Sequence, residues 1–246
     1  MGEGYLTMAA QTPDTDSAAL DPFLSLKQGG TEILFVRHAD ALPGPDEVID
    51  GGYDAQSLSE LGRRQAAALG NRLRDAGLAA VYASPIGRAR ETARYVADAA
   101  GLDVIIEDDL REVELGHIGP EAREGLTPDE IATVLRKRLH EIATVIVTTG
   151  RWSAIAGSEP SSALRLRVSN VIDRIAARRP GQRVVVVSHG GAINAYFAAI
   201  LGIELDYFFP AANTSISIAR VNGQRRIILA LNDVGHLREH GLVEAG

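Results

Sequence analysis

The sequence predicts an α/β fold, namely a three-layer, doubly wound and mostly parallel sheet with helices on both faces and an inserted helical lobe over the functional site. Three short apolar runs, at residues 33–36, 79–83 and 104–106, alternate with segments of helical periodicity. This order favours parallel crossover units. A fourth run, Val184-Val185-Val186-Val187, is wholly β-branched, as is typical of a central strand buried on both faces.

Five helices are expected between and after these strands. The first begins at Ser59, carries its apolar residues on one face and is expected to end at Gly77. The second covers about residues 88–100 and stops at Gly101. The third opens with Thr127-Pro128-Asp129-Glu130, a capping box with proline at the first helical position, and stops at Thr149-Gly150. Two more are expected over residues 164–175 and 192–201.

The remaining segments complete the predicted organisation. Residues 215–221 and 227–231 flank Asn222-Gly223, which predicts a hairpin with a two-residue turn. Residues 1–30 are expected to form a flexible leader and residues 31–246 a single domain. Residues 107–159 interrupt the strand–helix alternation, so we interpret them as the inserted lobe.

Composition restricts the classes of function. The 246 residues are 46% hydrophobic and 23% charged, as in ordinary globular domains, and the formal net charge of −7 argues against nucleic acid or an anionic membrane as partner. The chain contains no cysteine, which excludes disulfides and thiolate metal sites and fits a cytoplasmic protein. No cofactor and no metal is predicted. Exposed edge strands leave a homodimer open.

Two predicted strands end in histidine, at Arg37-His38 and at Ser188-His189-Gly190-Gly191. A single buried histidine is usually structural, but the carboxyl ends of parallel strands meet at one rim, where ligands bind. The glycine pair adds backbone N–H groups at a helix N-terminus, which favour an anion. Arg88 begins a helix at the same rim, where a bound anion would offset its unfavourable position on the helix dipole. Alone, Arg88 would be read as an exposed side chain. Together these residues predict an anion-binding active site.

Four motifs occur in order along the chain: Arg37-His38 after the first strand, Leu58-Ser59-Glu60-Leu61-Gly62-Arg63-Arg64-Gln65-Ala66, Ser84-Pro85-Ile86-Gly87-Arg88-Ala89-Arg90-Glu91-Thr92-Ala93, and Ser188-His189-Gly190-Gly191. Together they resemble the histidine phosphatase superfamily, also called the phosphoglycerate mutase-like family. The resemblance covers roughly residues 31–235.

The resemblance implies a role for each matching residue. His38 matches the nucleophile that becomes a phosphohistidine, Arg37 and Arg88 match the arginines that bind the phosphoryl group, and His189 matches the histidine that contacts the same oxygens. Gly190 is expected to add a backbone contact to the phosphate. The chemistry of these side chains suits the implied roles. Guanidinium groups offer paired donors to phosphate oxygens, and a neutral imidazole attacks phosphorus without a separate base.

The remaining requirement is an acid for the departing alcohol. Residues 110–119 resemble the family segment that supplies it, and Glu112 holds the matching place, with Glu114 as the alternative. His117 in this segment is expected to line the entrance. Ala39 stands where members usually have glycine, so a positive φ there would be strained. Asp40 either adds negative charge beside the site or points outward as a loop carboxylate.

The expected function is a metal-independent phosphomonoester hydrolase that acts on a small phosphorylated substrate of unknown identity. The alternatives are a mutase that returns the phosphoryl group to another hydroxyl and a non-catalytic protein that binds a phospho-ligand. Asn213 and its neighbours either contact the substrate or form a turn. Trp152, the single tryptophan, is expected to pack rather than stack on substrate.

Overall fold

The computed structural model describes residues 24–41, 56–116 and 125–243. Its six strands form one sheet in the order β3-β2-β4-β1-β5-β6. The elements follow along the chain as β1 (Thr31–Arg37), α1 (Glu60–Leu73), β2 (Leu78–Ala83), α2 (Gly87–Ala100), β3 (Val104–Ile106), α3 (Pro128–Thr149), α4 (Ser161–Arg178), β4 (Arg183–Ser188), α5 (Gly190–Leu201), β5 (Ile216–Asn222), β6 (Arg225–Asp233) and α6 (Gly235–Arg238). Strands β1 to β4 run parallel, whereas β5 and β6 pair antiparallel at one end, which confirms the mostly parallel α/β sheet.

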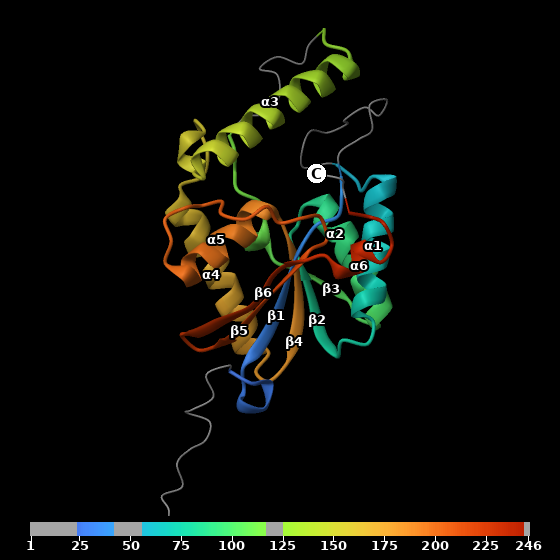
Figure 1. Cartoon of the computed structure of the whole chain (residues 1–246), viewed down its shortest axis with the longest axis vertical. Coiled ribbons are helices and arrows are strands. Elements are labelled where there is room, and N and C mark those ends of the chain that lie inside the picture. Colours follow the sequence, from blue (N-terminus) through green and yellow to red (C-terminus); the bar gives the residue numbers. More distant parts are fainter. Residues whose placement is uncertain (1–23, 42–55, 117–124, 244–246) are drawn as a thin grey trace, which may run out of the picture.

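Alternate residues of the central strands build two separate cores. Ile33 and Phe35 of β1 pack with α4 and α5 on one face, whereas Leu34 and Val36 pack with α1 and α2 on the other. In β4, Val184 and Val186 join the first core and Val185 and Val187 the second, all four fully buried. The side-chain period of two therefore requires helices on both faces, as Figure 1 shows.

Pairing between β1 and β4 sets the position of the site. Although about 150 residues separate the two strands, Val36 is the register partner of Val187 and Arg37 that of Ser188. The backbone N–H of His38 donates to the carbonyl of Ser188 at 2.9 Å. The residues that follow each strand, His38 and His189, therefore leave the sheet side by side.

Helix α3 lies above this rim of the sheet, apart from the three layers (Figure 1). Thr127 caps its start with both hydrogen bonds of the predicted capping box, and Gly150 ends it in a left-handed conformation. Among the described residues, none of the helices is long and apolar enough to cross a membrane. Residues 117–124, which include His117, fall outside the part of the chain that the structure describes.

Among the boundaries that differ from the sequence expectation, three change a turn or a helix cap. Helix α1 ends at Leu73 rather than near Gly77, which instead turns the chain into β2 with a φ of +67°. Helix α5 begins at Gly190, directly after its cap His189. Asn222 pairs with Arg225, so the hairpin turn consists of residues 223 and 224, one position later than expected.

The predicted leader, residues 1–30, falls mostly outside the described residues, which begin at residue 24. Its described end belongs to the fold. Residues Leu26–Gln28 form a 3-10 turn, and Leu24 is buried with 4% of its surface exposed.

Candidate active site

His38 lies at the base of the site with one ring nitrogen held and the other facing an arginine. Its Nδ1 lies 2.8 Å from the carbonyl of Ala39, and its Nε2 accepts from Nε of Arg88 at 3.1 Å. Because an arginine only donates, Nε2 must be the acceptor, which places the imidazole proton on Nδ1. The ring is therefore a neutral imidazole with its lone pair on Nε2.

His189 is oriented in the same manner. The terminal nitrogen of Arg88 lies 3.3 Å from its Nδ1, and its Nε2 lies 2.8 Å from the hydroxyl of Ser84. With Nδ1 accepting from Arg88, Nε2 carries the proton and donates to Ser84. The two imidazole rings are 5.1 Å apart between centroids. Arg88, 1% exposed, thus contacts both histidines.

Burial and positive charge together keep both rings neutral. Burial is the main cause that lowers the pKa of His38 well below its usual range; the charges of Arg88 and Arg37 act in the same direction. The pKa of His189 is also lowered well below the usual range, first by burial and then by Arg88. Both histidines are therefore unprotonated at neutral pH, and in each ring the unprotonated nitrogen accepts a hydrogen bond from Arg88.

Arg37 contributes the second guanidinium. One terminal nitrogen donates to the carbonyl of Ala211 at 2.7 Å, whereas its Nε is buried without a hydrogen-bond partner among the described residues. A buried guanidinium N–H without a partner is costly, and a phosphoryl oxygen in the pocket would supply the missing acceptor.

The first and third of the four motifs are joined through the hydroxyl of Thr92. The N–H of Ala39 donates to the hydroxyl of Thr92, which in turn donates to the carbonyl of Arg88, at 2.9 and 2.8 Å. This links the segment after β1 directly to α2, the helix that carries Arg88. The described non-glycine residues with positive φ do not include Ala39, so alanine is tolerated there.

The motif at residues 58–66 holds Asp40. Its carboxylate accepts from the hydroxyl of Ser59, and its N–H donates to Gln65 at 2.9 Å. Gly62 lies so close to the carbonyl of Asp40 that a Cβ there would overlap with it. Asp40 also lines the pocket, so it adds negative charge beside the site, as one alternative expected. Its hydrogen bond with Ser59 also makes it a loop carboxylate, as the other alternative expected.

Glu112 lines the pocket and is fixed by three backbone donors. Its Oε1 accepts from Val113 and Ala192 at 2.9 and 3.1 Å, and its Oε2 accepts from Gly191 at 3.2 Å. Gly191 and Ala192 lie at the start of α5, whose dipole favours a carboxylate there. The sequence predicts that the backbone N–H groups after His189 bind the phosphate. In the structure the N–H groups of Gly191 and Ala192 instead donate to the carboxylate of Glu112. Gly190 lines the pocket.

Glu114, the alternative candidate for the acid, does not line the pocket. Its side chain is 64% exposed and pairs with Arg111 at 3.1 Å. The side-chain positions therefore favour Glu112.

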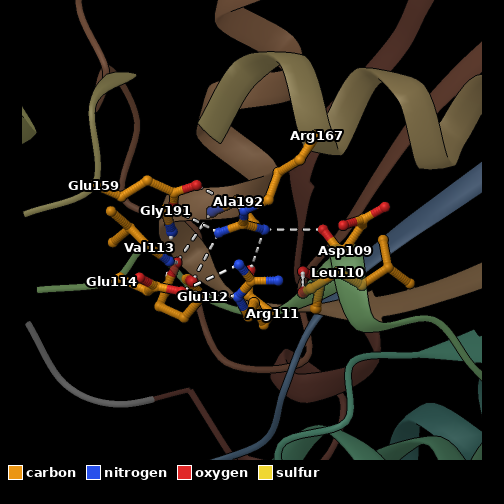
Figure 2. Close-up of polar contacts among 11 residues, drawn as sticks. Asp109, Leu110, Arg111, Glu112, Val113, Glu114, Glu159, Arg167, Gly191 and Ala192 are labelled. Atoms are coloured by element: carbon orange, nitrogen blue, oxygen red, sulfur yellow. Dashed lines mark hydrogen bonds and ion pairs between the residues drawn. The ribbon is translucent and has the colours of Figure 1, made fainter. Parts of the chain in front are cut away.

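Arg167 of α4 holds the segment that carries Glu112 (Figure 2). It forms two hydrogen bonds to the carboxylate of Glu159, at 2.8 and 2.7 Å, and donates to the carbonyls of Asp109, Arg111 and Glu112, each at 2.9 Å. All five guanidinium N–H groups are used. The side chains of Arg167 and Glu159 are only 11% and 10% exposed. Sequence reasoning missed this network, because no pattern distinguishes Arg167 from the other arginines of α4.

These groups surround one pocket of about 370 Å³. Its base contains Arg37, His38, Arg88 and Glu112, and Asn213 lines it while donating to the carbonyl of His38 at 2.9 Å. Trp152 is packed as expected, 6% exposed, with an edge on the pocket. Five of the predicted site residues thus line one pocket, namely Arg37, His38, Arg88, Glu112 and Gly190. His189 does not line this pocket; it is fully buried and contacts Arg88, so its expected contact with the phosphoryl oxygens stays a prediction.

Comparison with known proteins agrees with this arrangement. The family model of the histidine phosphatase superfamily (branch 1) matches residues 33–234, which is most of the chain. The chain belongs to the histidine phosphatase superfamily. The match spans β1 to β6 and therefore includes every residue of the site described above.

Individual relatives of this superfamily carry different names. The chain is 31% identical over 210 residues to phosphoserine phosphatase 1 of Hydrogenobacter thermophilus, covering 85% of this chain and 95% of the relative. It is 30% identical over 220 residues to a probable phosphoglycerate mutase of Erwinia tasmaniensis, covering 87% and 98%. Among solved structures, YhfR of Bacillus stearothermophilus is 28% identical with a TM-score of 0.66, covering 84% of this chain and 99% of that one. The relatives thus include both a named phosphatase and a named mutase.

Proposed function

We propose that this member of the superfamily is a metal-independent phosphomonoester hydrolase that works through a phosphohistidine on His38. The observation that carries the proposal is the neutral state of His38, which lines the pocket together with Arg37 and Arg88. Its Nδ1–H donates to the carbonyl of Ala39 and its Nε2 accepts from Arg88, a hydrogen bond that a phosphoryl oxygen would take over as Nε2 attacks. Such a ring needs no further base to attack phosphorus.

In the first step, Nε2 of His38 attacks phosphorus and the bond between phosphorus and the ester oxygen breaks. The electron pair of that bond goes to the oxygen, which takes a proton from protonated Glu112 and leaves as the alcohol. Arg37 and Arg88 neutralise the charge on the transferring group, which is the main demand of phosphoryl transfer. His189 orients Arg88 through the contact at 3.3 Å.

In the second step, deprotonated Glu112 accepts a proton from water, whose oxygen attacks the phosphohistidine. The bond between phosphorus and nitrogen breaks, its electron pair returns to Nε2, and inorganic phosphate leaves. Oε2 of Glu112 accepts one backbone hydrogen bond and Oε1 accepts two, so Oε2 has the freer lone pair and is our candidate for carrying the proton.

Access of water favours hydrolysis over mutase chemistry. A mutase must keep water away from the phosphohistidine, whereas the α3 side of this pocket is lined by Ala143 and Val147, both exposed to solvent. Incubation with 3-phosphoglycerate separates the two activities, because a hydrolase releases inorganic phosphate and a mutase yields the isomer.

The His38→Ala variant tests the assignment of the nucleophile. We expect loss of turnover by at least about a thousandfold with an unchanged circular dichroism spectrum, because no other group can form the intermediate. His240→Ala, an exposed histidine, is the matched control. Labelled phosphate should be trapped on the wild type in an acid-labile form and not on His38→Ala. Substantial turnover by His38→Ala would reject the assignment, and binding without labelling would favour a non-catalytic phospho-ligand protein.

A further inference from the structure

The pocket has a polar base, formed by the predicted site residues, and an apolar wall, formed mainly by α3. Five residues of α3 line it, and all five are apolar: Leu139, Ile142, Ala143, Ile146 and Val147. Their spacing of three and four places them on one face of the helix. Val113, Leu115 and Trp152 line the pocket as well. A phosphate bound at the base would therefore place the rest of its molecule against apolar side chains.

Val147 shows that part of this wall is uncovered. Its side chain lines the pocket, yet it is 78% exposed, the largest exposed fraction among the large apolar residues described. Ile142 and Ile146 on the same face are 7% and 4% exposed. An apolar side chain at the mouth of a phosphate pocket gains free energy when the ligand covers it with apolar surface.

The charged residues that line the pocket also favour a substrate whose alcohol is apolar. Among the described residues that line it, the cations are Arg37 and Arg88, and both lie next to His38. The carboxylates are Asp40 and Glu112. A substrate with a carboxylate of its own would find both described arginines engaged with its phosphate and would meet negative charge, which lowers its affinity.

We propose, resting on the hydrolase function above, that this pocket selects phosphomonoesters of apolar alcohols, such as alkyl or arylalkyl phosphates, over esters whose alcohol carries a carboxylate. The α3 wall binds the apolar group and the arginines bind the phosphate. The preferred substrate class therefore differs from phosphoserine, which the name of one relative carries.

The test compares kcat/KM for hexyl phosphate and phosphoserine, both esters of primary alcohols. We expect the wild type to prefer hexyl phosphate by at least about tenfold. Val147→Thr, which replaces a methyl group by a hydroxyl of similar size, should lower kcat/KM for hexyl phosphate about threefold to tenfold. It should lower kcat/KM for phosphoserine by a smaller factor, so that the ratio of the two kcat/KM values falls. Val134→Thr is the matched control, because Val134 is 39% exposed on the same helix but does not line the pocket.

Binding of non-hydrolysable phosphonates separates this inference from the proposed function. Calorimetry should give a lower Kd for hexylphosphonate than for 3-phosphonopropionate, whether or not the protein turns over esters. Equal Kd values, or equal kcat/KM values for the two esters, would overturn the apolar preference while hydrolysis stands. If the protein hydrolyses no ester but still binds hexylphosphonate more tightly, the proposed hydrolase function is overturned and the apolar preference of the pocket stands.

Discussion

Replacing Arg167 by methionine should damage both the stability of the fold and the position of Glu112. The change removes five hydrogen bonds and leaves the carboxylate of Glu159, 10% exposed, without its cation. Removing one partner of a buried ion pair costs about 3 to 5 kcal/mol, because the remaining charge stays desolvated. We therefore expect the free energy of unfolding to fall by about that amount.

Arg174→Met on the same helix is the matched control. Arg174 also pairs with this segment, with Asp109 at 2.9 Å and Glu107 at 3.6 Å, but its side chain is 43% exposed. Solvent screens such pairs, so the expected loss is below about 1 kcal/mol. Urea unfolding followed by the fluorescence of Trp152 measures both variants.

The double variant Arg167→Met, Glu159→Met separates stability from positioning. It removes both charges, so most of the lost stability should return. The carbonyl of Glu112 still lacks its anchor, and kcat should therefore remain low. The loss should be larger for an alkyl phosphate than for 4-nitrophenyl phosphate, whose leaving group needs no proton from an acid. An anchoring role of Arg167 is refuted if Arg167→Met lowers the free energy of unfolding no more than Arg174→Met does, or if the double variant recovers full kcat.

Two further predictions concern the same site. Gly191→Ala should lower kcat at least about tenfold, because a Cβ there would lie 2.5 Å from Oε1 of Glu112 and 2.9 Å from Trp152, and unchanged steady-state kinetics would contradict this. The free energy of unfolding should fall as the pH drops below about 6.5, since the unfolded chain binds protons that buried His38 and His189 do not, by up to about 1.4 kcal/mol per pH unit for each histidine. Urea titrations at pH 7.5, 6.5 and 5.5 should show a smaller slope for His38→Ala, and an equal slope would count against the buried neutral histidine.

Local chemistry was enough to predict most of the secondary structure. The run of four valines became β4, all buried, because β-branched side chains suit a strand that is covered on both faces. Thr127 and Gly150 marked both ends of α3 through hydrogen bonds within one turn. The hairpin was expected one residue early, because Asn222-Gly223 is a favoured turn pair, whereas cross-strand pairing of Asn222 with Arg225 decided the register.

The sequence by itself also predicted the residues proposed for the site, since each lies in a motif that can be read along the chain: His38, His189, Arg37, Arg88 and Glu112. Only the tertiary structure decided how these residues are arranged. The pairing of β1 with β4, the fixing of Glu112 by α5, the anchor at Arg167 and the apolar wall of α3 all join segments that are far apart in sequence. Such contacts depend on register and packing across the whole domain, and no local pattern encodes them.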